Sequence, residues 1–263
     1  MLRTIFWLHA LIAGVAGGAL YLFPRPAGGI WPWPLPALAA RFVGALLFSG
    51  ALYSGLTAAA RSDLPIRGAL LMATLLYGLI ALVGVLGSGE IGLTPALLVW
   101  LAIFGGLTLL FGALLVAHRA APAPAPGTRA HGRPQVRELR ELLLVDLVLV
   151  APVGLVMYLA PALARRFWPW DLAPINVRLI GSIFVATAVL TLWSLQQRTW
   201  EAVGPSIVAG GAFTTLALIA SLIHFNLFDP NRLVTWLFVA LYVIVAVGAW
   251  FVVWRQTRLE TNV

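Results

Sequence analysis

Long apolar stretches alternate with short polar breaks along the whole chain. Eight of these stretches are long enough to cross the hydrocarbon core of a bilayer, which takes roughly 20 apolar residues in a helix. The breaks between them hold Pro, Gly and nearly all of the charge. The pattern therefore predicts eight transmembrane helices, at about residues 4–23, 38–60, 68–87, 95–117, 141–164, 175–197, 204–225 and 233–254.

The composition points to the same class of protein. Of the 263 residues, 61% are hydrophobic and only 10% are charged, and the mean hydropathy is +0.96. A soluble domain carries about 25% charged residues, and a water-soluble chain could not cover so much apolar surface. We therefore predict an all-α, polytopic membrane protein whose partners are membrane lipids and other membrane proteins, and not nucleic acid.

The first half of the chain recurs in the second half. Shifted by 137 positions, residues 14–61 align without a gap with residues 151–198, and the alignment matches a rare Trp-Pro-Trp tripeptide. Each copy holds an even number of spans, so both enter the membrane from the same side. This predicts two parallel four-helix repeats, 1–117 and 141–263, related by a pseudo-two-fold axis along the membrane normal. Other matched pairs include Gly17/Gly154, Tyr21/Tyr158, Pro24/Pro161, Arg41/Arg178, Gly44/Gly181 and, at an offset of 136, Trp100/Trp236.

Residues 118–140 join the two copies and are rich in Ala, Pro and Arg, which favours an extended linker without a core of its own. If this linker and both termini are cytoplasmic, 11 of the 17 Arg lie on the cytoplasmic side and 6 on the other. The positive-inside bias thus predicts a multi-pass protein of the cell membrane with both termini cytoplasmic. We also expect the fifth helix to begin early, because Arg137 and Glu141 are four residues apart.

Each Trp-Pro-Trp tripeptide follows the first helix of its repeat, on the non-cytoplasmic side. Indole rings favour the membrane–water interface, and Pro suits a turn there because it has no N–H to leave unpaired. We predict that Trp31, Trp33, Trp168 and Trp170 are interfacial anchors that set the depth of the following helix. The alternative is an aromatic lip over a binding site.

Arg41 and Arg178 lie eight residues beyond the second Trp of each tripeptide. A charge at this depth is costly unless it is compensated. We expect each guanidinium to reach lipid headgroups, a helix C-terminal carbonyl or an acidic side chain in the equivalent loops, where Glu90 and Asp229 lie. Binding of an anionic ligand is the alternative. Asp229 also begins an Asp-Pro-Asn turn that predicts the start of the last helix.

Two ionisable residues fall inside predicted membrane helices at the same register of the two copies. They are His9 in the first helix and Asp146 in the fifth. Such residues are the first place to look for function in a membrane protein. One interpretation is an imidazole–carboxylate pair across the pseudo-axis. The other is that each reaches the headgroups on its own.

The chain offers few residues for catalysis or metal binding. It has no Cys, no HExxH and no G-x-S-x-G sequence, and no pair of carboxylates is expected inside the membrane. We therefore predict no catalytic, cofactor or metal residues. The expected function is non-enzymatic, with a structural, accessory or assembly role. A transporter or channel for a small apolar or lipid-like solute is the alternative, and a membrane-embedded enzyme comes third.

Overall fold

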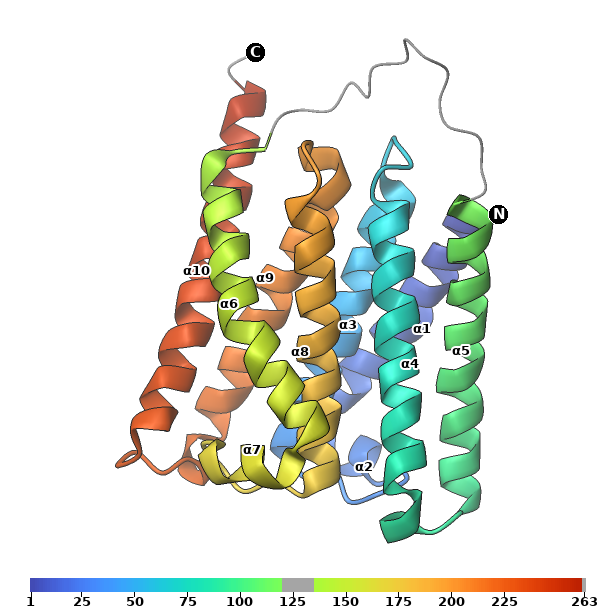
Figure 1. The fold of residues 1–263 in the computed structure, drawn as a ribbon, viewed down its shortest axis with the longest axis vertical. Helices are drawn as coiled ribbons and strands as arrows, with labels where there is room; N and C mark the ends of the chain where they lie inside the picture. Colours follow the sequence, from blue (N-terminus) through green and yellow to red (C-terminus); the bar gives the residue numbers. More distant parts are fainter. Residues whose placement is uncertain (120–134, 262–263) are drawn as a thin grey trace.

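The chain folds into a bundle of eight long helices that run alternately up and down (Figure 1). The structure is a computed structural model that describes residues 1–119 and 135–261. All eight helices are long and apolar enough to cross a membrane, and the described residues form no β-strand, so the eight-span all-α prediction is confirmed. The long helices are α1 (Leu2–Leu22), α3 (Ala37–Ala59), α4 (Ile66–Ile91), α5 (Pro95–Arg119), α6 (Arg137–Leu159), α8 (Pro174–Leu195), α9 (Trp200–Ile223) and α10 (Leu233–Thr261).

Helices α3 and α8 form the centre of the bundle and are the most buried of the eight. In the first half, α1 packs on α3 and α4 on α5; in the second, α6 packs on α8 and α9 on α10. The two halves meet where α3 contacts α9 and α4 contacts α8. Helices from both halves of the chain therefore pack against each other in the interior of the bundle.

Glycines allow the first helix of each half to approach the second very closely. A Cβ atom on Gly17 would lie 2.5 Å from the main-chain nitrogen of Phe48, and one on Gly154 would lie 2.9 Å from that of Val185. Real side chains do not pack at such distances. The matched glycines of the sequence alignment are therefore places where backbones touch.

A short helix follows the first long helix of each half. In the second half, the long helix also ends earlier than the sequence predicted. The fifth span was expected to run to residue 164, but α6 ends at Leu159 and α7 (Pro161–Phe167) begins after a break. Pro161 causes the break, because proline disfavours the α conformation of the residue before it; Ala160 has φ −129° and ψ 61°. Helix α2 (Pro24–Gly28) follows α1 in the same way.

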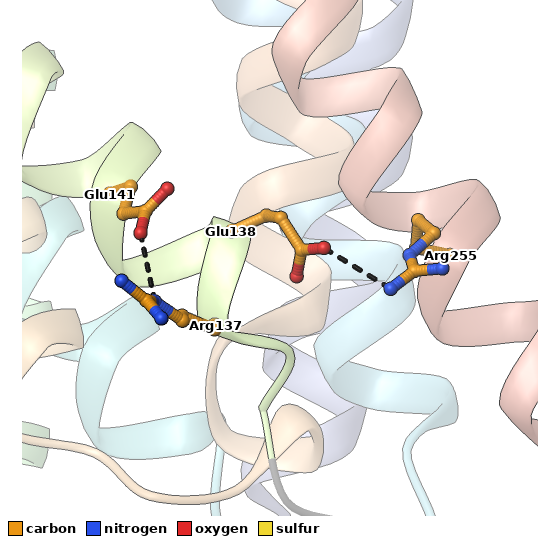
Figure 2. Close-up of polar contacts among 4 residues, drawn as sticks. All are labelled: Arg137, Glu138, Glu141 and Arg255. Carbon is orange, nitrogen blue, oxygen red and sulfur yellow. Dashed lines mark hydrogen bonds and ion pairs between the residues drawn. The ribbon is translucent and has the colours of Figure 1, made fainter.

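Ion pairs fasten the start of α6. Arg137 Nε lies 3.0 Å from Glu141 Oε1, as the i,i+4 spacing predicts. Arg255 of α10 reaches Glu138 with an N···O distance of 3.1 Å, so the first turn of α6 is tied to the last turns of α10 (Figure 2). Residues 120–134 of the predicted linker lie outside the described part of the chain.

The last helices of the two halves, α5 and α10, place Trp100 and Trp236 in different surroundings, although the two residues match in sequence. Trp100 is buried, whereas Trp236 is 52% exposed. Phe238 is buried instead, and it packs on Trp170 as Trp100 packs on Trp33, with ring centroids 5.3 and 5.0 Å apart. Phe238, and not Trp236, therefore occupies a buried position like that of Trp100.

Candidate functional site

A partly open cavity of about 170 Å³ lies between α3 and the helices of the second half. Its walls come from α6, α8, α9 and α10, together with α3 and one side chain of α4. Most of the lining is apolar, and Asp146 is the only charged residue among the described residues that form it. A mostly apolar cavity with few polar groups is typical of a small-molecule site.

Asp146 projects from α6 into this lining and has one hydrogen-bond partner on the neighbouring helix. Thr191 Oγ1 of α8 donates to Asp146 Oδ2 at 2.9 Å. Among the described residues, no Arg or His contacts the carboxyl group. A carboxylate inside a membrane helix is costly without a compensating charge, so the site needs a positive charge or a proton that the cavity wall does not supply.

Two tyrosine side chains of the lining are almost fully buried, with Tyr53 6% and Tyr242 4% exposed. Their hydroxyl groups have no hydrogen-bond partner among the described residues. A buried hydroxyl without a partner costs about 1–3 kcal/mol, and such groups call for an explanation. Both hydroxyl oxygens are fully buried, and that of Tyr53 lies beside Gly68 of α4, so it is the tyrosine rings that line the cavity. Neither tyrosine was predicted from the sequence as part of a site.

The corresponding region of the first half is filled by aromatic rings. His9, 137 positions before Asp146, lies 2.7 Å from Ser54 Oγ through Nδ1, and Nε2 meets the hydroxyl of Tyr77. The His9 ring packs edge-on against the ring of Phe111, with centroids 5.3 Å apart. Phe6 also packs on the ring of Phe111. The second half carries smaller side chains at these places, and there the cavity opens.

The smaller side chains follow the register of the two halves. Thr214 stands 137 positions after Tyr77, and Leu143 stands 137 positions after Phe6. On the last helix, where burial gives an offset of 138, Ala249 stands for Phe111. All three replacements line the cavity. The sequence alignment therefore contains this difference in side-chain size. It becomes visible only when the sizes of the matched residues are compared.

His9 and Asp146 thus each have their own partners in the structure, Ser54 and Tyr77 for the first and Thr191 for the second. No hydrogen bond or ion pair between the two is present among the described residues. The hydroxyl partners of the two, Ser54 and Thr191, are also 137 positions apart. Each half therefore joins its first and second helices through an ionisable residue and a hydroxyl.

Arg41 and Arg178 make the same bond in the two halves. Arg41 Nε donates to the carbonyl of Tyr21 at 3.1 Å, and Arg178 Nε donates to that of Tyr158 at 3.2 Å. Both carbonyls lie in the last turn of the preceding membrane helix, where carbonyl groups lack a helical partner. A helix C-terminal carbonyl was one of the three partners expected for these side chains.

Arg41 has a second partner, His224, which lies just beyond the end of α9. A guanidinium has only donors, so His224 Nε2 accepts the bond and the imidazole is neutral. Burial, and to a smaller extent the Arg41 charge, lowers the pKa of His224 below its ordinary value. Arg178 has Gly87 at the position equivalent to His224, so this contact is confined to one half.

The two loop acids are exposed and are not paired with these arginines. Glu90 lies in the last turn of α4, and no ion pair joins it to Arg41 or Arg178 in the described chain. Asp229 Oδ1 accepts a hydrogen bond from the main-chain nitrogen of Asn231 at 2.9 Å, as in an Asx turn. The second acid therefore shapes the turn that leads into α10.

Both Trp-Pro-Trp tripeptides pack against protein. Trp33, Trp168 and Trp170 are buried, and Trp31 is partly buried. Trp33 Nε1 donates to Asn176 Oδ1 of α8 at 2.9 Å, which connects the two halves. These rings form two aromatic clusters at the same end of the bundle. Their depth relative to a bilayer stays a prediction.

No group of three or more His, Cys, Asp or Glu side chains that could hold a metal ion occurs among residues 1–119 and 135–261. Comparison with protein-family models, with curated proteins and with solved structures gave no match to this chain.

Proposed function

We propose that this chain is a non-enzymatic integral membrane protein that binds a small, mostly apolar molecule in the cavity of its second half. The observation that carries this proposal is the cavity itself, with mostly apolar walls and a single carboxyl group, that of Asp146. Apolar walls supply affinity through burial, and a few polar groups supply orientation. A purely structural or assembly role would leave the cavity and its polar groups without a purpose.

The composition of the lining supports binding over catalysis. Acid–base or nucleophilic chemistry needs a reactive group beside a base that is itself oriented by a third group. In the described lining, Asp146 has a hydroxyl neighbour, Thr191, and no imidazole or second carboxylate. We therefore place the protein with ligand-binding membrane proteins.

Transport of the bound molecule is the second candidate. Ser49, Gly50 and Tyr53 of α3 belong to the first half, and the rest of the wall comes almost entirely from the second half. A site between two halves changes shape when one half moves against the other, as alternating access requires. Uptake of the ligand into proteoliposomes would distinguish a transporter from a protein that binds and retains its ligand.

We also propose that the two halves are copies of one four-helix unit related by a pseudo-two-fold axis along the membrane normal. Two reciprocal hydrogen bonds support this proposal. The hydroxyl of Tyr21 donates to the carbonyl of Leu216 at 2.8 Å, and the hydroxyl of Tyr158 donates to that of Leu79 at 3.1 Å. Both donors and both acceptors are 137 positions apart, and a two-fold relation produces contacts exchanged in this way.

We propose that the protein lies in the cell membrane with both termini in the cytoplasm. The support is the excess of Arg on that side. Helix α1 begins and α10 ends at the same end of the bundle (Figure 1), as an even number of spans requires.

Mass spectrometry of the purified protein tests the binding proposal and requires no choice of ligand. Gly210 lines the cavity, and a Cβ atom on it meets nothing within 4 Å, so Gly210→Leu adds a bulky side chain at the cavity wall from a position where the Cβ itself does not clash. Gly106 of α5 is equally open and lies outside the lining, so Gly106→Leu is the matched control. We expect a lipophilic molecule that co-purifies with the wild type and the control and is lost from Gly210→Leu. An identical set of bound molecules in all three proteins would refute the proposal.

A further inference from the structure

The polar groups of the cavity restrict the kind of ligand that fits it. Asp146 is the only charged residue of the described lining, and its one hydrogen-bond donor, Thr191, is neutral. The remaining walls consist mainly of aliphatic and aromatic side chains, among them Phe184 and Phe213, with several neutral Ser and Thr side chains. The site therefore combines a single negative group with an apolar and aromatic surround.

The first half shows how such a position is satisfied when no ligand is needed. There the ionisable residue is His9, which meets two hydroxyls and lies between aromatic rings. Neutral imidazole requires no compensating charge. The second half has an acid in place of the imidazole and an open space in place of the rings, so both its charge and its volume are left uncompensated by the protein.

We infer that the cavity binds a small lipophilic amine, with its ammonium group against Asp146 and its apolar body against the walls formed by α8, α9 and α10. This inference rests on the proposed binding function and names the class of ligand. An ammonium supplies the positive charge that a carboxylate in the membrane requires, and charge-assisted hydrogen bonds are about twice as strong as neutral ones. Tyrosine rings also attract cations through their faces, and Tyr53 and Tyr242 belong to the same lining.

The alternative is that a proton neutralises Asp146. In that case the carboxyl group is an ordinary hydrogen-bonding group, and the cavity takes neutral molecules as well as cations. A matched pair of probes separates the two cases. Adamantan-1-amine and adamantan-1-ol have the same compact hydrocarbon body, and at neutral pH the first carries an ammonium group and the second a hydroxyl group.

Isothermal titration calorimetry of both probes with the full-length protein in detergent, with protein-free micelles as the blank, tests the inference. We expect the wild type to bind the amine at least about tenfold more tightly than the alcohol, as one charge-assisted bond allows. Asp146→Asn should remove this preference and leave the affinity for the alcohol within about threefold of the wild type. Asp63→Asn is the control, because it removes an exposed loop carboxylate that pairs with Arg3 and should leave the preference intact.

Equal affinities of the wild type for the two probes would overturn the inference, and this comparison needs no variant that folds. A preference that persists in Asp146→Asn would overturn it too. In both cases binding of the alcohol that is lost in Gly210→Leu would still support the proposed function. Failure of both probes to bind would count against the cavity as a ligand site and therefore against both proposals.

Discussion

The hydroxyl of Tyr158 donates to the main-chain carbonyl of Leu79, 3.1 Å away in the other half of the chain. Tyr21 makes the exchanged bond to Leu216 at 2.8 Å. Each bond reaches a helix carbonyl, which has a second lone pair for a side-chain donor. The two tyrosines therefore tie the halves together at the contacts of α1 with α9 and of α6 with α4.

Removal of either hydroxyl should weaken the protein by the value of one hydrogen bond. We expect Tyr21→Phe and Tyr158→Phe each to lower the free energy of unfolding by about 0.5–1.5 kcal/mol, which corresponds to a fall of a few degrees in the melting temperature in detergent. Tyr242→Phe is the control, because its buried hydroxyl has no partner among the described residues, so its removal should leave the melting temperature unchanged or raise it. Unequal effects of the two equivalent substitutions would contradict the repeat proposal.

The close approach of α1 to α3 should make Gly17 intolerant of any side chain. A Cβ atom there meets backbone atoms at 2.5 and 2.8 Å, so Gly17→Ala should destabilise the protein by about 1–3 kcal/mol through overpacking. Gly18, on the same helix, has nothing within 4 Å, so Gly18→Ala should be neutral or stabilising by up to about 1 kcal/mol, since Ala favours a helix. Thermal unfolding of the two variants side by side measures the difference, and equal melting temperatures would contradict the packing described.

The contact of His224 with Arg41 should make stability depend on pH. Burial and the nearby guanidinium lower the pKa of His224 in the folded protein, so the unfolded chain takes up a proton first as the pH falls. The stabilising contribution is complete above the unfolded value of about 6.5 and is lost as the pH falls below it. We expect a smaller drop in melting temperature between pH 7.5 and pH 5 for His224→Gln than for the wild type. Curves of the same slope would show that this imidazole does not contribute.

The orientation in the membrane can be tested with one reporter at the end of the chain and one in an internal loop. The positive-inside bias predicts cytoplasmic ends, so a reporter active only in the cytoplasm should work when fused to residue 263, and one active only outside it should not. A reporter inserted after Gly92, in the loop that joins α4 to α5, should behave in the opposite way and is the internal control. The reverse result at both sites would invert the topology.

The periodic features of the sequence predicted the bundle well, because spans of roughly 20 apolar residues leave the chain few alternatives in a bilayer. The matched glycines and arginines also proved to make equivalent contacts, since backbone contact and helix-end bonding depend on position along the helix. The cavity escaped notice for the opposite reason. It is lined by side chains from six different helices, and Tyr53 of α3 and Tyr242 of α10 come together only in the folded protein. The burial of Trp33, Trp168 and Trp170 was missed because indole placement depends on neighbours such as Phe238.

The cavity should close when the second half receives the aromatic residues of the first. Thr214→Tyr and Ala249→Phe would restore the rings that Tyr77 and Phe111 supply around His9. Filling apolar space stabilises a protein when the added ring fits, and each buried aromatic ring contributes roughly 1.5–3 kcal/mol relative to an exposed one. We expect the double variant to melt several degrees higher than the wild type in detergent, and to bind neither adamantan-1-amine nor adamantan-1-ol.

The control for this variant lies on the other side of the bundle. Gly105→Phe adds a ring to α5 at a position with nothing within 4 Å and outside the cavity lining, and it should change neither the melting temperature nor the binding of either probe appreciably. A double variant that is less stable than the wild type yet still binds both probes would show that the rings are excluded from the space. In that case the size difference between the halves would not be the origin of the cavity.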